Sequence, residues 1–257
     1  MRYRRAATGA ALLAASLCAG AEGRAARDAG VVYDLSIAGV PIGEATLRVV
    51  IDEARYRVEG TAEVGFLFWG GSGRAVSEGR ATAEGLAPES YRLRYEGATR
   101  PGAIDIAFED GRATRWERRP DWTRDDAEDA REARVALRAE DLAGVLDPLS
   151  ALVIPAPEDI APEALCRRVR PVFTGYTRFD LDLGGAAPGP AGAPGAVVCA
   201  ARYRPVSGHR VGSQRAERMQ RPGAFSVRLA PVGEGVWGPD RVALRTRFGT
   251  FELLRRR

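Results

Sequence analysis

The fold is decided by two neighbouring runs. The first is Cys166-Arg-Arg-Val-Arg-Pro-Val-Phe-Thr-Gly-Tyr-Thr-Arg-Phe-Asp-Leu-Asp-Leu183, and the second, after a Gly/Pro-rich loop, is Ala196-Val-Val-Cys-Ala-Ala-Arg-Tyr203. Both are strand-like and each carries a cysteine near one end, so we expect adjacent strands that a disulfide ties together. The first run divides into strands over 169–174 and 177–183. The pattern predicts a mainly β, disulfide-stapled protein.

Residues 1–21 have the pattern of a cleaved signal peptide. A start with three arginines precedes a short apolar run over 6–19, and Ala19-Gly20-Ala21 offers small residues for cleavage. The run is shorter than the ~20 residues that span a bilayer. Cys18 suggests a lipoprotein signal as the alternative, but the bulky Leu17 precedes it. We expect export to the periplasm of a Gram-negative bacterium, with no transmembrane segment after cleavage.

Cleavage at that position removes Cys18 and leaves the pair Cys166 and Cys199. An even pair in an oxidising compartment favours a disulfide, worth about 3–4 kcal/mol in the chain-entropy account. Two buried free thiols are the alternative. Residues 22–257 contain no repeat and no obvious linker, which favours a single mainly β domain.

The charge of the chain is nearly balanced once the signal segment is removed. Three of the 38 basic residues precede residue 22, so 35 basic and 34 acidic residues remain. Nucleic-acid binding requires a clustered basic face. The only dense basic run is Arg255–Arg257, which is typical of a solvated tail. We therefore expect no nucleic-acid partner.

Alternating polar and apolar residues predict many short strands. In the run over 31–38, Tyr33, Leu35 and Ile37 share one face, which is the period of a half-buried strand. Other strands are expected over 44–52, 55–69, 74–83, 90–97, 103–108, 112–117, 196–205, 224–230, 242–248 and 250–254. Asp110-Gly111 is a strong hairpin signal. The succession predicts a large, curved, barrel-like antiparallel meander.

Three segments interrupt this pattern. Gly70-Gly-Ser-Gly73 is expected to form a hinge or wide turn, and it lacks the Lys-Ser/Thr of a phosphate loop. Residues 120–139 form a charged insertion that we expect to be solvated and partly helical. Residues 184–195 lack the side chains for a core and are expected to be mobile.

A helical pattern lies over residues 140–154. Its apolar stripe consists of Leu142, Val145, Leu146, Leu149, Leu152 and Val153. Asp147-Pro148 interrupts the stripe and suits the N-cap and first turn of a new helix. We expect two short turns meeting at Asp147 and packed on the concave face of the sheet. A lid over an apolar cavity is the alternative.

No catalytic or metal-binding pattern stands out. His209 is the only histidine, Ser207 is too close in sequence to serve as its nucleophile, and no Gly-x-Ser-x-Gly elbow occurs. Two oxidised cysteines cannot complete a zinc site. We interpret His209 as a surface hydrogen-bonding residue and expect no catalytic residues, no cofactor and no metal.

Several motifs, taken in order, resemble one family. These are Val32-Tyr-Asp-Leu with Gly39 and Gly43, Asp147-Pro-Leu-Ser-Ala-Leu152, Cys166 together with Phe173-Thr-Gly-Tyr-Thr-Arg-Phe-Asp-Leu181, Cys199-Ala-Ala-Arg-Tyr203, and Arg247-Phe-Gly-Thr250. The chain is similar over residues 31–254 to the exported bacterial family known as domain of unknown function 3108. The resemblance implies a periplasmic location and a large curved antiparallel sheet, and it brings no activity and no catalytic residues.

Three functions are compatible with these patterns. The first is a non-enzymatic periplasmic protein that holds an apolar, lipid-like ligand in the curved sheet, and its predicted lining is Phe66, Phe68, Trp69, Leu146 and Leu149. The run Phe66–Trp69 suggests this role because it is apolar on both faces, although a covering helix explains it as well. The second is a scaffold or interaction module with a solid core and an envelope protein as its partner. A carboxylate-dependent hydrolase ranks last.

Overall fold

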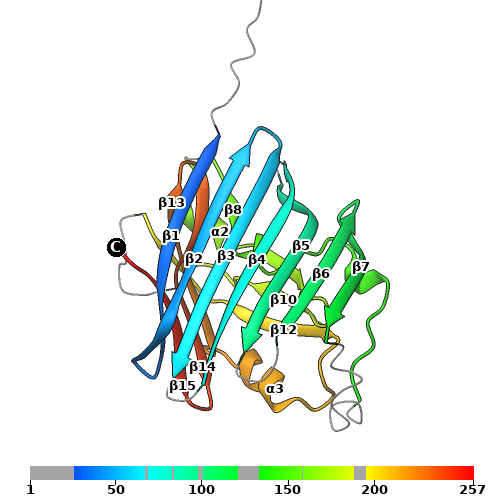
Figure 1. Ribbon diagram of the computed structural model, residues 1–257. Helices are drawn as coiled ribbons and strands as arrows, with labels where there is room; N and C mark the ends of the chain where they lie inside the picture. The colour runs from blue at the N-terminus through cyan, green and yellow to red at the C-terminus, as the bar shows by residue number, and fades with distance from the viewer. Residues whose placement is uncertain are drawn as a thin grey trace, which may run out of the picture.

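Two antiparallel sheets build the protein (Figure 1). The computed structural model describes residues 26–66, 69–82, 84–97, 101–120, 133–157, 159–187 and 195–257. The large sheet contains β1 (Arg27–Ile37), β2 (Val40–Asp52), β3 (Arg55–Phe66), β4 (Trp69–Thr82), β5 (Gly85–Gly97), β6 (Gly102–Glu109), β7 (Arg112–Arg119), β8 (Ile154–Pro155), β11 (Val197–Cys199), β13 (Phe225–Gly233), β14 (Val236–Thr246) and β15 (Gly249–Arg255). The small sheet contains β9 (Val169–Phe173), β10 (Arg178–Asp182) and β12 (Arg202–Ser207). The predicted signal peptide lies outside the described residues.

The large sheet is a curved meander that stays open. Its order is β11-β13-β14-β15-β1-β2-β3-β4-β5-β6-β7, with β8 paired to β14, so β7 and β11 are its edges. The first strand of the chain pairs with the last, with Tyr33 opposite Arg255. The predicted antiparallel meander is confirmed, and the curvature does not close it into a barrel.

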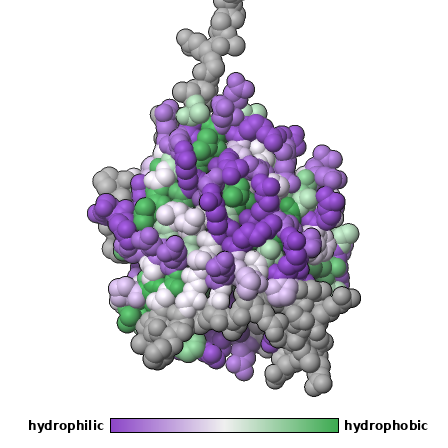
Figure 2. All heavy atoms as spheres, in the orientation of Figure 1, coloured by the Kyte–Doolittle hydropathy of each residue, from purple (hydrophilic) through white to green (hydrophobic). Residues whose placement is uncertain are grey.

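The alternation in the sequence separates the two faces of the sheet. Inward-facing side chains such as Tyr33, Val49 and Val58 are at most 3% exposed, as expected for one buried face per strand. The outward face carries arginines paired with carboxylates across neighbouring strands, including Arg48–Asp28, Arg57–Glu78, Arg74–Glu59, Arg92–Glu78, Arg94–Asp105 and Arg119–Asp105. Figure 2 shows this face as largely hydrophilic.

Residues 133–157, called the strap below, cross the concave face. They contain two 3₁₀ turns, η2 (Glu140–Leu142) and η3 (Ser150–Leu152), on either side of Asp147. The expected turns are therefore present, but the segment between them is not helical. Gly144 has a φ of +64°, a left-handed conformation that ends a helical turn.

Two short helices were not expected from the sequence. They are α2 (Pro162–Leu165) and α3 (Gln214–Gln220), and the Ser213 hydroxyl caps α3 by accepting from the Ala216 N–H. Helix α3 buries only Ala216, so it offers no apolar stripe to recognise. Within the described ranges, no helix has the length and apolar character needed to cross a bilayer.

The strap and the small sheet cover the concave face of the large sheet. Leu146 forms a bridge to Val172 of β9, and the Phe173 ring lies edge-on to Trp116 of β7 with centroids 5.2 Å apart. One core cluster lies between β1–β7 and the strap, and a second surrounds the two cysteines. Strands β13 and β14 contribute to both clusters, through Val232 and Val236 to the first and Val227 and Trp237 to the second.

The glycine-rich run Gly70–Gly73 is a strand rather than the expected hinge. It begins β4, where Gly71 pairs with Gly97 and Gly73 pairs with Tyr95. A Cβ at Gly71 would lie 2.7 Å from the carbonyl oxygen of Glu96. The glycine permits this close approach of the β4 and β5 backbones. Gly71 therefore allows the two strands to pair and does not bend the chain.

The other two interrupting segments are described only at their ends. Residues 121–132 of the charged insertion and 188–194 of the Gly/Pro loop lie outside the described residues. The described end of the insertion is extended, since Val135 donates to the carbonyl of His209. The start of the loop is also hydrogen bonded, because Ala187 donates to the carbonyl of Val198 and Ala186 bridges Cys199.

The predicted disulfide joins Cys166 and Cys199, and both cysteines are fully buried. It links the end of α2 to β11, and the second core cluster forms around it. The cross-link therefore anchors the segment that carries the small sheet to the edge of the large sheet.

We expect the double substitution Cys166→Ser, Cys199→Ser to lower the free energy of unfolding by about 3 kcal/mol, because it releases a closed loop in the unfolded chain. Urea denaturation measures this loss. Reduced wild-type protein is the control and should match the double variant. An unchanged midpoint after reduction would contradict a stabilising cross-link.

Candidate functional site

The strap fills the concave face with its own side chains. Val145, Leu149 and Val153 are at most 8% exposed and join Tyr56 and Val58 of β3 in the main core cluster. At the centre of β3, a Cβ at Gly60 would lie only 2.9 Å from Cδ2 of Leu149. The absence of a side chain at residue 60 therefore makes room for Leu149.

The predicted lining is only partly described, because the structure gives the side-chain positions of Leu146 and Leu149 and the backbone alone of Phe66 and Trp69. Leu149 packs on Gly60, and Leu146 is half-buried and binds β9 through its backbone, donating to Pro171 and accepting from Phe173. Phe66 pairs with Trp69 at the end of the β3–β4 hairpin. Six residues of strand separate Gly60 from Phe66, which is about 20 Å. Phe68 lies outside the described residues.

We expect Leu149→Ala to lower the free energy of unfolding by about 3 kcal/mol, because it leaves a cavity above Gly60. Gly60→Ala should be tolerated better in the Leu149→Ala background than in the wild type, since the new methyl group then enters vacated space. Chemical denaturation of the double-mutant cycle measures this coupling. A loss below about 1 kcal/mol for Leu149→Ala would instead indicate a side chain that lines open space.

A buried polar cluster attaches the strap to the sheet, and it consists of Tyr56, Ser77, Asp147, Ser150 and Arg170. Oδ1 of Asp147 accepts from the backbone N–H groups of Leu149 (2.9 Å) and Ser150 (3.0 Å). Oδ2 accepts from the hydroxyls of Ser77 (2.7 Å) and Ser150 (2.6 Å). Both serine hydroxyls donate their hydrogen to the carboxylate, so neither can donate to Tyr56. The Tyr56 hydroxyl therefore donates to a serine oxygen, and it lies 2.8 Å from Ser150 Oγ and 3.1 Å from Ser77 Oγ.

Arg170 of β9 completes this cluster. Its Nη2 donates to the carbonyls of Ser150 (2.7 Å) and Val153 (2.8 Å), and its charge interacts favourably with that of Asp147. Burial lowers the pKa of Arg170 to about 10. Burial likewise raises the pKa of the Asp147 carboxyl, although its four hydrogen bonds act in the opposite direction.

The cluster connects four elements, β3, β4, β9 and the strap, and Ser77, Asp147 and Ser150 at its centre are sealed from solvent. Ser77, Asp147 and Ser150 are all 0% exposed, so no substrate reaches the serine hydroxyls or the carboxylate in this conformation. The backbone contacts of Asp147 are those of a helix N-cap, as the sequence predicted. The arrangement therefore holds the strap in place.

We expect Asp147→Ala to lower the free energy of unfolding by about 3 kcal/mol or more. The substitution leaves two backbone N–H groups, two hydroxyls and the Arg170 charge buried without their carboxylate partner. Asp147→Asn is the matched control, since its amide oxygen still accepts from the backbone while its volume is preserved. It should cost clearly less in urea denaturation. Equal losses would show that the backbone hydrogen bonds of residue 147 contribute little.

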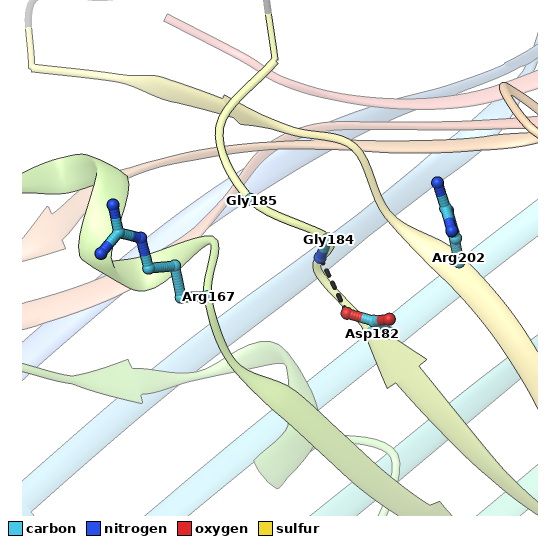
Figure 3. A pocket seen from close by; sticks show the side chains of 5 residues that line it. All are labelled: Arg167, Asp182, Gly184, Gly185 and Arg202. Atoms are coloured by element: carbon cyan, nitrogen blue, oxygen red, sulfur yellow. Dashed lines mark hydrogen bonds between the residues drawn. The ribbon is translucent and has the colours of Figure 1, made fainter.

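A polar hollow of about 370 Å³ lies beside the disulfide and is lined by Arg167, Asp182, Gly184, Gly185 and Arg202. Figure 3 shows the two arginines on either side of the glycines. Asp182 is already occupied, because it accepts from the Gly184 N–H (2.9 Å) and pairs with Arg204. The lining therefore offers guanidinium donors to a small anion.

A second hollow, of about 450 Å³, lies at the end of β3–β5 and is also rich in charge, including Glu63, Arg74, Arg94 and Glu96. Within the described ranges, no three His, Cys, Asp or Glu side chains gather as metal ligands. His209 is half-buried, and its Nδ1 has no hydrogen-bond partner among the described residues. Its expected role in surface hydrogen bonding stays a prediction.

Sequence reasoning found only part of the buried cluster. Asp147 was recognisable from Asp-Pro as an N-cap, but Tyr56, Ser77 and Arg170 carry no local signal. The alternation of β3 and β4 points Tyr56 and Ser77 inward, yet their partner lies 70 or more residues further along the chain. The two arginines of the polar hollow, Arg167 and Arg202, lie in the two strand-like runs quoted first, and no local pattern singles them out.

The fold and these contacts define a class of mainly β protein in which an open curved sheet is filled from its concave side by a strap. The chain belongs to the family described as protein of unknown function DUF3108, whose model matches residues 32–186. The matched region includes the second half of β1, all of β2–β7, the strap and the complete Asp147 cluster. No curated protein and no solved structure matches the chain.

Proposed function

We propose that this protein is a non-enzymatic protein of the bacterial envelope that acts through its surface, as a scaffold or interaction module on a solid core. The observation that carries the proposal is the filled concave face. Leu149 occupies the space above Gly60, and the Asp147 cluster fixes the strap that brings it there. The two hollows described above are both lined by charged side chains, which suit a polar rather than an apolar ligand.

Two features support an exported location. The buried Cys166–Cys199 disulfide is typical of proteins that fold in an oxidising compartment such as the periplasm. The first 21 residues have the three-part pattern of a cleaved secretory signal. The periplasmic location that the family resemblance implies is consistent with both.

The edge strand β7 is a surface that suits a protein partner. Beyond the bridge from Arg112 to Ala143, no described residue pairs with its outer side. It carries Arg112, Arg115, Arg118 and Arg119, which discourage pairing with a second copy of itself. An extended acidic segment of another protein could add to this edge as a further strand.

Native mass spectrometry with organic extraction, on protein purified gently from the periplasm, tests the proposal. We expect the mass of the polypeptide alone, because the side chains of the strap fill the concave face over the described strands. In-cell crosslinking from β7, with Arg115→Cys as the attachment site, should then capture a discrete protein partner.

The matched crosslinking control is Arg48→Cys, on the outward face of β2 away from the edge. A reproducible lipid-sized mass in the extract would contradict the proposal and favour the carrier function, in which the strap opens to admit an amphiphile. Identical crosslinking from both positions would contradict the assignment of β7 as the partner edge.

A further inference from the structure

The disulfide holds two arginine-bearing segments together beside the small sheet. Arg167 follows Cys166 directly, and Arg202 lies three residues after Cys199 at the start of β12. Both arginines line the polar hollow of about 370 Å³ described above. Because the cross-link fixes the backbone of both segments, the fold sets the positions from which the two guanidinium groups reach the hollow.

A glycine turn lies between the two arginines (Figure 3). The Gly185 N–H donates to the carbonyl of Cys166 (2.7 Å), and the Ala200 N–H donates to the carbonyl of Gly185 (3.0 Å). A Cβ at Gly184 would lie 2.1 Å from the carbonyl oxygen of Ala200, whereas a Cβ at Gly185 would meet no atom within 4 Å. The turn is therefore bonded to both cysteine-bearing segments and leaves open space at Gly185.

The lining of the polar hollow carries uncompensated positive charge. Arg167 and Arg202 are exposed, and neither makes an ion pair with any described residue. Asp182 lies opposite Arg202 in the register of β10 and β12, but its carboxylate pairs with Arg204 and accepts from the Gly184 N–H. This differs from the outward face of the large sheet, where cross-strand ion pairs neutralise arginines. Two guanidinium charges therefore remain without a partner at the hollow.

We propose that the polar hollow binds the phosphate group of a phosphomonoester. Such a group carries a charge of about −1.5 to −2 at neutral pH, which matches two guanidinium groups. Its three terminal oxygens accept hydrogen bonds from several directions, as donors on either side of the glycine turn require, and arginine binds phosphate through paired N–H groups. A carboxylate has a single charge and two oxygens in one plane, so it would satisfy only one of the arginines.

The size of the polar hollow indicates that the phosphate group belongs to a larger molecule. Its volume lies at the lower end of the range of about 300–1,000 Å³ that is typical of small-molecule sites, and a bare phosphate ion would fill only part of it. The ester can be a soluble small molecule or the headgroup of a lipid, and both present the same anion to the arginines. This assignment goes beyond the proposed interaction role of β7 and does not depend on it.

Isothermal titration calorimetry with glycerol 3-phosphate tests the site, and uncharged glycerol is the ligand control. We expect the wild-type protein to bind the ester with a dissociation constant of about 1 mM or lower, and to give no binding heat with glycerol. Arg167→Gln and Arg202→Gln should each raise the dissociation constant by about tenfold, because each removes one charged donor. Arg202→Lys should restore only part of the affinity, since an ammonium group lacks the paired N–H donors.

The matched protein control is Arg245→Gln, which removes an exposed arginine of β14 that does not line the polar hollow. It should bind the ester like the wild type, and all variants should keep the wild-type unfolding midpoint because the three arginines are exposed. Absence of wild-type binding at about 10 mM ester would overturn the proposal. Equal affinities of the hollow variants and the wild type would do the same. So would an equal loss in Arg245→Gln, which would indicate a response to the overall charge of the protein.

Flotation with phosphatidylcholine vesicles identifies the source of the phosphate group. Phosphatidic acid supplies the phosphomonoester in these vesicles, and phosphatidylglycerol, a phosphodiester, is the lipid control. Flotation with phosphatidic acid but not with phosphatidylglycerol, together with its loss in Arg202→Gln, would assign a lipid headgroup. Binding of glycerol 3-phosphate without flotation would assign a soluble ester. Neither measurement involves β7, so the phosphate site and the proposed function fail separately.

Discussion

The Asp147 carboxylate is the constraint on which the arrangement of the protein depends. A curved open sheet presents a broad apolar face that must be covered, and the strap covers it with almost no regular secondary structure of its own. Burying a carboxylate is unfavourable unless its lone pairs are occupied. Asp147 meets that condition only where the Ser77 side chain of β4 and the backbone of the η3 turn converge on it. The polar cluster therefore selects one position of the strap among the many that apolar contacts alone would allow.

This attachment determines which surfaces remain available for function. The concave face is occupied by the chain itself, and the outward face neutralises its own charges through cross-strand ion pairs, each of which contributes little to stability when exposed. A face whose charged side chains are already paired with one another is a poor site for specific binding. The edges of the sheet are left, and there the arginine-bearing β7 stands out.

The sequence predicted the strands well, because the burial of one face of a strand determines which of its residues are apolar. Tyr33 and Leu35 alternate with Asp34 and Ser36 because each strand is buried on one face only, so the strands and the meander were predictable. The strap was predicted less well, since the apolar stripe over 140–154 reports burial but Gly144 and Pro148 prevent a continuous helix. The lining predicted for Phe66 and Trp69 stays a prediction, since their apolar pattern indicates apolar surroundings without giving their position along the strand. The contacts between Asp147 and Ser77 depend on tertiary pairing that no local pattern encodes.

The pairing of β1 with β15 has a consequence for how the chain acquires its structure. The two halves of the large sheet, β2–β7 on one side and β13–β14 on the other, are joined only through strands from opposite ends of the chain. Contacts of such wide sequence separation form slowly, because the loop entropy is lost before the contacts compensate for it. The sheet therefore becomes continuous only after β15 has joined β1, and until then β1 lacks one of its two neighbours.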